Sequence, residues 1–444
     1  MSSELIDRTP VPDRAGVIIP WTMPADRPDR ERLSETSGLV EALGCNLAFL
    51  RPENVRKPSA SHLLSGGILE RLREDIAASA CTLCVIDAAL TPVQQRNLER
   101  ALSCKVIDRT GLILEIFGLR ARTKEGKLQV ELARLSYERS RLVRTWTHLE
   151  RQRGGQGFLS GPGETQLEAD RRMLDRQLAS LKSDLEEVRR TRGLQRSGRR
   201  DAGFPVIALV GYTNAGKSTL FNRMTGANVF ARDMPFATLD PTIRRLELPG
   251  LGDAALVDTV GFITDLPTHL IDSFRATLEE TLEADLLIHV RDRSEDSDEA
   301  RKQDVLSVLR RLEEESGQPL PPIIEAWNKI DLLPEDIQET LRMSARAGLQ
   351  ETPAVITSAL TGEGIDDLLA LVQHSIQDEL NSFAVQLSPS QGAARAWLFE
   401  YGAVSEETVQ PDGRTDLLVG LSEKHEGRFR SQFPDVELFA QTAS

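Results

Sequence analysis

The sequence predicts a multidomain α/β protein whose third region is a doubly wound P-loop nucleotide-binding domain. Three observations predict this class: a length of 444 residues, the phosphate-cradle spacing in GYTNAGKST at residues 211–219, and apolar runs that alternate with amphipathic stretches on both sides of a leucine-periodic region. Chains of this length divide into domains of about 100–200 residues. We therefore expect two to four domains.

Strand-like and helix-like stretches alternate through residues 1–118, from GVIIPW to CKVIDRTGLILEIFG. This alternation predicts a small N-terminal α/β domain with a largely parallel sheet. The four cysteines are too few for a disulfide scaffold, but Cys81 and Cys84 form CTLC, which could be a redox pair. The surrounding ACTLCVIDAAL favours a buried strand, so packing is the preferred interpretation.

A long helical pattern follows within residues 119–200. Leucines at 128, 132, 135 and onward, and again at 174, 178, 181 and 185, recur at heptad-like spacing. The glycine-rich segment 154–164, GGQGFLSGPGE, separates them and does not permit a continuous helix. We therefore expect an antiparallel helical hairpin (coiled coil) with a glycine-rich tip, followed by a linker at 193–203.

Charge is unevenly distributed along the chain. The net charge is −14, but residues 119–200 hold 20 Lys and Arg against 11 Asp and Glu. A basic segment in an acidic protein is typical of a surface that attracts nucleic-acid phosphates. Alternatively, the arginines only keep a coiled coil soluble. Those that flank the tip are Arg151, Arg153, Arg171 and Arg172.

The sequence predicts neither a membrane span nor a signal peptide. No stretch approaches the roughly 18 apolar residues of a membrane span, and the start, MSSELIDRTPVPDRAG, does not resemble a signal peptide. We expect a cytoplasmic monomer without stable membrane insertion. The six histidines show no metal-pair spacing.

Residues 201–378 carry the nucleotide chemistry, and residues 379–444 suggest a small α+β C-terminal domain. The cradle follows the apolar run PVIALV and opens a helix, so its backbone amides can face phosphate oxygens. In this motif Lys217 reaches the β- and γ-phosphates and Ser218 ligates magnesium. A P-loop is therefore predicted.

Further motifs identify the nucleotide. In AALVDTVG the apolar strand ends at Asp258 and Gly261 follows closely, as a carboxylate near magnesium and an amide that senses the γ-phosphate. In NKID, Asp331 would accept hydrogen bonds from the guanine N1 and exocyclic amine, which adenine does not offer. The segment after PAVIT would close over the base. The predicted ligand is GTP, and either Thr238 or Thr242 could be the switch threonine.

Water positioning has no obvious residue. Phe262 follows Gly261 where Ras-like enzymes carry a glutamine, so the catalytic residue is unknown and intrinsic hydrolysis should be slow. Asn214 has two open interpretations: it holds a monovalent cation such as K⁺, or it only shapes the loop.

GPGETQLEADRR at 161–172, together with GYTNAGKST, FATLDPT, DTVGFI and NKID, resembles the HflX family of ribosome-associated GTPases. The likeness also covers VIDRTGLILEIF and AWLFEYGAVSEETV. It implies an N-terminal α/β domain, a helical hairpin, a G domain and a small C-terminal domain. It further implies binding to the large (50S) ribosomal subunit and its rRNA, stimulated GTP hydrolysis, and splitting or rescue of stalled ribosomes.

The resemblance also implies which residues hold the ligands. Magnesium would bind Ser218 and Thr238. Nucleotide contacts would come from Gly211, Tyr212, Thr213, Asn214, Ala215, Gly216, Lys217, Ser218, Phe236, Ala237, Thr238, Leu239, Asp240, Asp258, Thr259, Val260, Gly261, Asn328, Lys329, Ile330, Asp331, Ser358, Ala359 and Leu360.

The sequence departs from the family pattern twice. HLLSGGILERL at 62–72 lacks the lysine of a glycine-rich IGSGK-like element, and Trp327 stands where a small aliphatic residue is expected. Two other functions compete: a tRNA-modification-type GTPase, for which no modification pocket is visible, and a scaffold whose coiled coil binds a protein under nucleotide control.

Overall fold

The computed structural model describes residues 13–152, 162–201, 205–227, 235–239, 241–248, 252–263, 281–347, 352–378, 381–421 and 423–440. By their contacts the residues divide into two compact units. The first comprises Met1–Glu186, Arg232–Asp240 and Asp265–Arg275. The second comprises Glu187–Ala231, Pro241–Thr264 and Ala276–Ser444.

The first unit contains a four-stranded sheet of order β2-β1-β3-β4 in which every strand pair is parallel. The expected largely parallel sheet is thus confirmed. Apolar side chains of α2 and α3 pack with Cys84 of β3 in one buried cluster. The elements are β1 Arg14–Trp21, η1 Pro24–Asp26, α1 Arg30–Ala42, β2 Asn46–Asn54, α2 Gly66–Ser79, β3 Leu83–Ile86, α3 Pro92–Leu102, β4 Lys105–Asp108 and α4 Arg109–Arg120.

The CTLC cysteines belong to this core. Cys81 and Cys84 are buried and free, and both lie in the apolar cluster. Burial raises the pKa of the Cys84 thiol well above its ordinary value. A protonated, enclosed thiol is a poor nucleophile, which supports packing over redox chemistry.

A buried ion-pair group joins the helices of this unit to the sheet. Asp87, directly after β3, accepts from Arg32 of α1 (Nε to Oδ2, 2.8 Å) and from Arg109 of α4 (Nη1 to Oδ1, 2.8 Å). Burial alone would raise the pKa of Asp87, but the two guanidinium groups lower it below its usual value. The carboxylate therefore stays charged and holds α1 and α4 at the carboxyl edge of the sheet.

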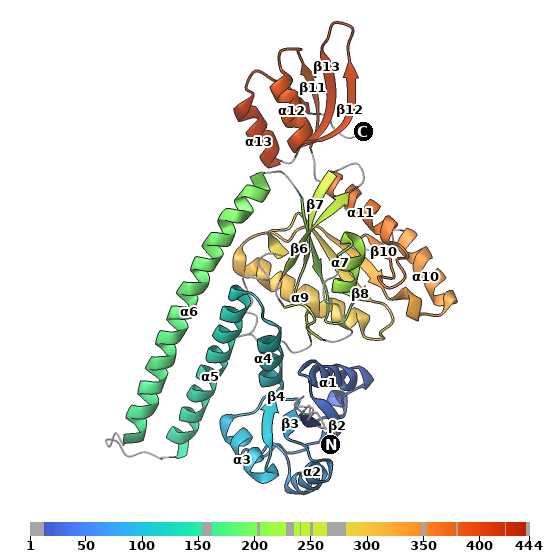
Figure 1. Cartoon of the computed structure of the whole chain (residues 1–444). Coiled ribbons are helices and arrows are strands. Elements are labelled where there is room, and N and C mark those ends of the chain that lie inside the picture. Colours follow the sequence, from blue (N-terminus) through green and yellow to red (C-terminus); the bar gives the residue numbers. More distant parts are fainter. Residues whose placement is uncertain are drawn as a thin grey trace, which may run out of the picture. The chain divides into compact units, whose positions relative to one another are not determined.

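Helix α5 (Lys124–Gln152) runs beside helix α6 (Pro162–Asp201), whose residues up to Glu186 belong to the first unit (Figure 1). Leu132, Leu178 and Leu185 form a buried cluster, with Leu128, Leu135 and Leu181 packed against it. Arg139 pairs with Asp175 at 2.8 Å. The leucines at 128–135 of α5 cluster with those at 178–185 of α6, whereas Arg139, later in α5, pairs with Asp175, earlier in α6. The two helices are therefore antiparallel.

The structure differs from the expected linker after the hairpin and leaves part of the expected tip outside the described residues. Most of the expected linker at 193–203 is instead the end of α6, which continues to Asp201. Gly193 and Gly198 each cost a helix roughly 1 kcal/mol, but their neighbours include strong helix formers such as Leu, Gln and Arg. At the tip, residues 153–161 lie outside the described residues, and α6 begins at Pro162, a favoured first helical residue.

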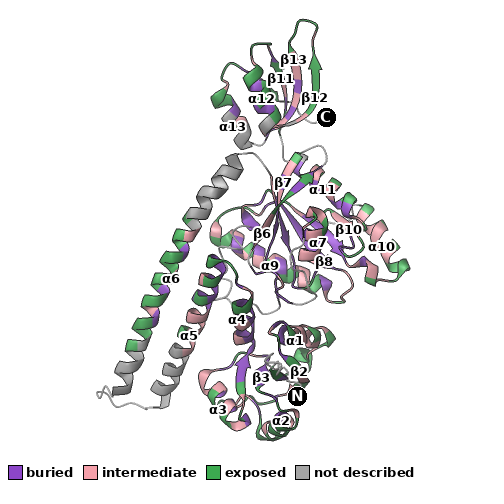
Figure 2. Ribbon diagram, in the orientation of Figure 1, coloured by how far each residue is buried: buried purple, intermediate pink, exposed green. Residues whose placement is uncertain are grey.

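The second unit contains a six-stranded sheet of order β10-β9-β8-β5-β7-β6, parallel except for the antiparallel pair β6 and β7. Its strands are largely buried (Figure 2), and side chains of α7 and α11 share their core. The elements are β5 Val206–Val210, α7 Lys217–Thr225, β6 Thr242–Leu248, β7 Gly252–Asp258, β8 Leu286–Asp292, α9 Asp298–Ser316, β9 Ile323–Asn328, η2 Ile330–Leu332, α10 Glu335–Arg346, β10 Ala354–Ile356 and α11 Ile365–Asp378.

The C-terminal part of the same unit has a separate antiparallel sheet of order β12-β13-β11-β14. Trp397 and Phe429 are buried at the centre of its core. This agrees with the small α+β domain expected from the sequence. The elements are β11 Asn381–Leu387, α12 Gly392–Tyr401, β12 Ala403–Val409, β13 Thr415–Leu421, α13 Glu423–Gln432 and β14 Leu438–Ala440.

Candidate nucleotide site

The P-loop joins β5 to α7 through two glycines that no other residue could replace without strain. Gly211 has a φ of 147°, and a Cβ there would lie 2.3 Å from the Val290 carbonyl oxygen. Gly216 has a φ of 96°, and its Cβ would lie 2.2 Å from Asn328 Nδ2. The spacing of the glycines thus follows from close backbone approach to β8 and β9.

Lys217 is enclosed by the loop that precedes it. Its Nζ donates to the carbonyl oxygens of Gly211 (3.0 Å) and Tyr212 (2.8 Å). Burial lowers the pKa of Lys217 to about 8, although the nearby Asp258 carboxylate acts to raise it. The ammonium is therefore held where it would gain most from a further anionic partner.

The segment that begins at Asp258 lies against the P-loop. Ser218 Oγ donates to Asp258 Oδ2 at 2.7 Å, and Asp258 is fully buried at the end of β7. A Cβ on Gly261 would lie 2.9 Å from Lys217 Nζ. A hydroxyl and a carboxylate side by side are the oxygen donors that Mg²⁺ prefers, so the residues present fit that ion.

Phe262 is part of the backbone frame of this site. Its carbonyl accepts from Thr213 N at 2.6 Å, and its own N donates to the Gly211 carbonyl at 3.2 Å. The side chain is buried. Phe262 therefore attaches the DTVG segment to the P-loop, and its ring has no polar atom for positioning water.

Two loops at the ends of β9 and β10 meet behind the P-loop. Asn328 Nδ2 donates to the Ala215 carbonyl at 2.8 Å, and Asn328 Oδ1 accepts from Ala359 N at 2.9 Å. Ser358 Oγ donates to Asp331 Oδ1 at 2.5 Å. Asn328 thus connects the phosphate loop with the segment 358–360, and Ser358 orients the carboxylate predicted to read guanine.

Lys329 has a supporting partner that the sequence motifs do not indicate. Lys329 adopts a φ of 63°, and its Nζ pairs with Asp292 Oδ2 at 2.8 Å. Asp292 ends β8, the strand between β5 and β9. One acidic residue at a strand end is a weak signal in the sequence, and only its neighbour in the sheet reveals its role. Ile330, the remaining residue of the motif, is fully buried.

The structure accounts for Trp327. Its indole Nε1 donates to Glu325 Oε2 at 2.7 Å, and the Arg293 guanidinium lies 4.8 Å from the ring centre. Glu325 also pairs with Arg291 and Lys302, at 2.7 and 2.9 Å. A small aliphatic residue would leave this buried carboxylate with one donor fewer, so the tryptophan belongs to a charged network under the sheet.

The candidate switch segment, of which the structure describes residues 235–239, belongs to the first unit. Phe236 has a φ of 55° and is buried, and its ring contacts Phe117 of α4 edge to face at 4.6 Å between centroids. Thr238 and Leu239 are also buried, whereas Ala237 is partly exposed. Asp240 lies outside the described residues. The alternative threonine, Thr242, starts β6 and is paired with Asp258 in the ladder.

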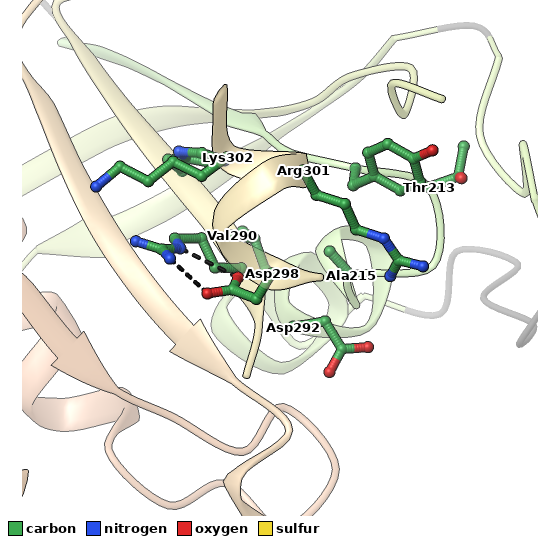
Figure 3. A pocket seen from close by; sticks show the side chains of 10 residues that line it. Thr213, Ala215, Val290, Asp292, Asp298, Arg301 and Lys302 are labelled. Atoms are coloured by element: carbon green, nitrogen blue, oxygen red, sulfur yellow. Dashed lines mark hydrogen bonds and ion pairs between the residues drawn. The ribbon is translucent and has the colours of Figure 1, made fainter. Parts of the chain in front are cut away.

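A small pocket with a cavity volume of about 10 Å³ lies beside the P-loop (Figure 3). Typical small-molecule pockets measure roughly 300–1,000 Å³, so this pocket is too small for a nucleotide. The Arg301 guanidinium lies 4.8 Å from the Tyr212 ring centre, and Arg291 pairs with Asp298. The pocket is lined by Tyr212, Thr213, Ala215, His289, Val290, Arg291, Asp292, Asp298, Arg301 and Lys302.

Two other kinds of feature are absent from the described ranges. No three His, Cys, Asp or Glu side chains gather there into a metal-binding group. Among the helices that the structure describes, none is long and apolar enough to cross a membrane. The arrangement around Lys217, Ser218 and Asp258 is thus the strongest candidate site.

Models of GTPase families match most of the chain. Four family models match in sequence: GTP-binding GTPase N-terminal (residues 30–118), GTP-binding GTPase Middle Region (120–199), 50S ribosome-binding GTPase (206–329) and HflX C-terminal domain (342–435). The last begins inside α10, although β10 and α11 still belong to the six-stranded sheet and its core.

Similar curated proteins cover most of the chain. GTPase HflX of Escherichia coli (strain K12) is 43% identical over 88% of this chain and 90% of its own length. GTPase HflX of Magnetococcus marinus is 42% identical over 96% of this chain and 97% of its own. These identities and coverages, together with the P-loop GTPase fold, show that the chain belongs to the HflX family of GTPases.

Proposed function

We propose that this GTPase binds GTP and GDP with Mg²⁺ at the P-loop site and acts on the large ribosomal subunit. The observation that carries the nucleotide part is the convergence of Lys217, Ser218 and Asp258 with Asn328, through their contacts around one loop. The full set of nucleotide contacts is the one that the family resemblance implies, from Gly211 to Leu360. GTP is hydrolysed there to GDP and phosphate.

Magnesium would be held by Ser218, which lies beside Asp258, and by Thr238. When bound, the ion neutralises charge on the β- and γ-phosphates. Thr242 is the weaker alternative, because its backbone is paired with β7 and a switch residue has to move. Ser218 Oγ and the Asp258 carboxylate already lie 2.7 Å apart, which supports an oxygen-ligand site at this place.

The residues of the chain divide the remaining tasks. Lys217 would hold the phosphates, the Gly261 amide would sense the γ-phosphate, and Asp331, oriented by Ser358, would accept from guanine. Phe262 is apolar, so another group must position the attacking water. Asn214 is exposed with a φ of 64°, which suits either a K⁺ ligand or a loop-shaping residue.

The proposed partner is the large subunit, contacted through the α5–α6 hairpin. Two observations support this: residues 119–200 hold 20 basic against 11 acidic residues, and the chain matches the 50S ribosome-binding GTPase model. The proposed domains are 1–118, 119–200, 201–378 and 379–444. The consequence of binding would be the splitting or rescue of stalled or idle ribosomes by a monomeric cytoplasmic protein.

The decisive experiment measures GTP turnover by the full chain with and without purified large subunits. We expect slow turnover by the protein alone, because the residue directly after Gly261 is apolar. With large subunits, turnover should rise at least tenfold, as it does with activators that complete a GTPase site. Small subunits at equal concentration are the control. Equal rates under all three conditions would contradict the ribosome-dependent function.

A further inference from the structure

Arg223 connects the helix of the phosphate loop to the loop that is proposed to cover guanine. It lies in the last turn of α7, whose first residue is Lys217. Its Nε donates to the Ala359 carbonyl at 3.2 Å, and its Nη2 donates to the Leu360 carbonyl. One short helix therefore begins at the phosphate site and ends on the base loop.

The other anchors of this loop come from the NKID motif. Ala359 N donates to Asn328 Oδ1, and Ser358 Oγ donates to Asp331 Oδ1. Both anchors act on the first half of the segment 358–360. Arg223 is bonded to the carbonyls of Ala359 and Leu360 and so holds its second half from a different element.

Side-chain packing does little to hold the end of the segment at Leu360. Leu360 is 71% exposed, so its position depends on backbone bonds rather than on burial. Gly362 follows with a φ of 95°, and the nearest atoms to a Cβ there would be those of the Arg223 guanidinium, at 3.7 Å. The planar guanidinium thus lies against the turn and satisfies two of its carbonyls at once.

We infer that Arg223 is a positioning residue for guanine, an inference that rests on the proposed nucleotide site. Arg223 holds residues 359 and 360, the adjacent Ser358 then stays bonded to Asp331, and the carboxylate keeps the orientation that accepts from the base. Loss of Arg223 should therefore weaken recognition of the guanine amine more than it weakens contacts to the phosphates.

The test measures the affinity of the full chain for GDP and for IDP, whose base lacks the exocyclic amine. Arg223→Gln removes the charge and the fork, Arg223→Lys keeps the charge, and Arg310→Gln is the matched control at an exposed arginine of α9. Two further readings accompany each variant: kcat at saturating GTP and the thermal midpoint of the nucleotide-free protein.

We expect Arg223→Gln to weaken GDP binding by about tenfold, which corresponds to about 1.4 kcal/mol, and IDP binding by distinctly less. The ratio of the IDP to the GDP dissociation constant should shrink, with Arg223→Lys in between and Arg310→Gln unchanged. For Arg223→Gln, kcat at saturating GTP should change less than the GDP dissociation constant, because Arg223 contacts the base loop, and the thermal midpoint should fall only slightly.

Two results would overturn the inference. The first is a ratio in Arg223→Gln equal to that of Arg310→Gln. The second is an equal loss of GDP and IDP affinity with a lower thermal midpoint, which would mean a general structural role. If Arg223→Gln does not fold, the ratio in Arg223→Lys decides. A wild-type protein that binds GDP and IDP equally would instead refute the proposed guanine site.

Discussion

Lys217 shows how the P-loop tunes a single side chain. Its ammonium is buried and bonded to two carbonyl oxygens of the loop, and burial lowers its pKa to about 8. A phosphate beside it would favour the charged form and raise that pKa again. Nucleotide binding above pH 8 should therefore be coupled to the uptake of one proton.

We predict that GDP affinity falls as the pH rises from 7 to 9, with a slope that approaches tenfold per pH unit above pH 8. The reason is that free Lys217 becomes neutral in this range, whereas the bound lysine stays charged. Titration calorimetry in buffers of different ionisation enthalpy measures the proton uptake. The side chain of Lys217→Arg does not titrate between pH 7 and 9. This variant should therefore keep only the pH dependence of GDP affinity that comes from guanine itself. Identical profiles for both proteins would contradict the assignment.

Asn214 gives a second prediction at this scale. If its exposed amide helps hold a monovalent cation, GTP turnover should be several-fold faster in K⁺ than in Na⁺, and Asn214→Ala should abolish the difference. A loop-shaping residue predicts equal rates in the two salts, because an asparagine at a φ of 64° needs no ligand to be tolerated. Turnover in matched chloride salts separates the two interpretations.

Single elements show which sequence signals are reliable. The leucine periodicity of 124–152 and 162–201 predicted two helices that pack together, because a helix that buries one face must repeat its apolar residues at that spacing. Composition misplaced the end of α6, where two glycines and several arginines suggested a linker at 193–203. Propensity is a weak local signal, and continuation of an existing helix needs no new nucleation.

For the helix pair, we predict that Leu178→Ala loosens α5 and α6. Leu178 is 6% exposed and packs in the cluster with Leu132 and Leu185, so truncation should cost about 2–4 kcal/mol. Hydrogen exchange of the amides in 124–141 should accelerate accordingly. Met173→Ala, at a residue of the same helix that is 49% exposed, is the control and should leave the exchange unchanged. Equal exchange in the two variants would show that the cluster contributes little.

At the scale of the whole molecule, the separation of charge is the main feature. The chain carries −14 overall, while 119–200 has an excess of nine basic residues. Such a segment binds polyanions by releasing their counterions, whereas the acidic remainder is repelled. The hairpin is therefore the part of the chain best suited to a polyanion such as the proposed rRNA partner.

We predict that Arg153→Glu with Arg171→Glu weakens binding to large subunits and flattens its salt dependence by about two units of the log–log slope. Arg171 is well exposed, with 60% of its side chain accessible, and Arg153 lies outside the described residues. Cosedimentation between low and physiological salt measures both effects. Arg73→Glu with Arg310→Glu changes the net charge equally at exposed sites elsewhere and should bind normally. Unchanged binding of the hairpin variant would leave the arginines only a solubilising role.

From the sequence alone, the order of the nucleotide motifs and the alternation of elements could be predicted, because glycine spacing, strand-end carboxylates and apolar periodicity are local patterns. Tertiary structure alone decided that Asp292 supports Lys329, that Phe236 packs on Phe117, and that Arg223 holds the base loop. Arg223 and Ala359 are 136 residues apart in the chain. Contacts of that separation depend on which strands become neighbours, and no local pattern of side chains records it.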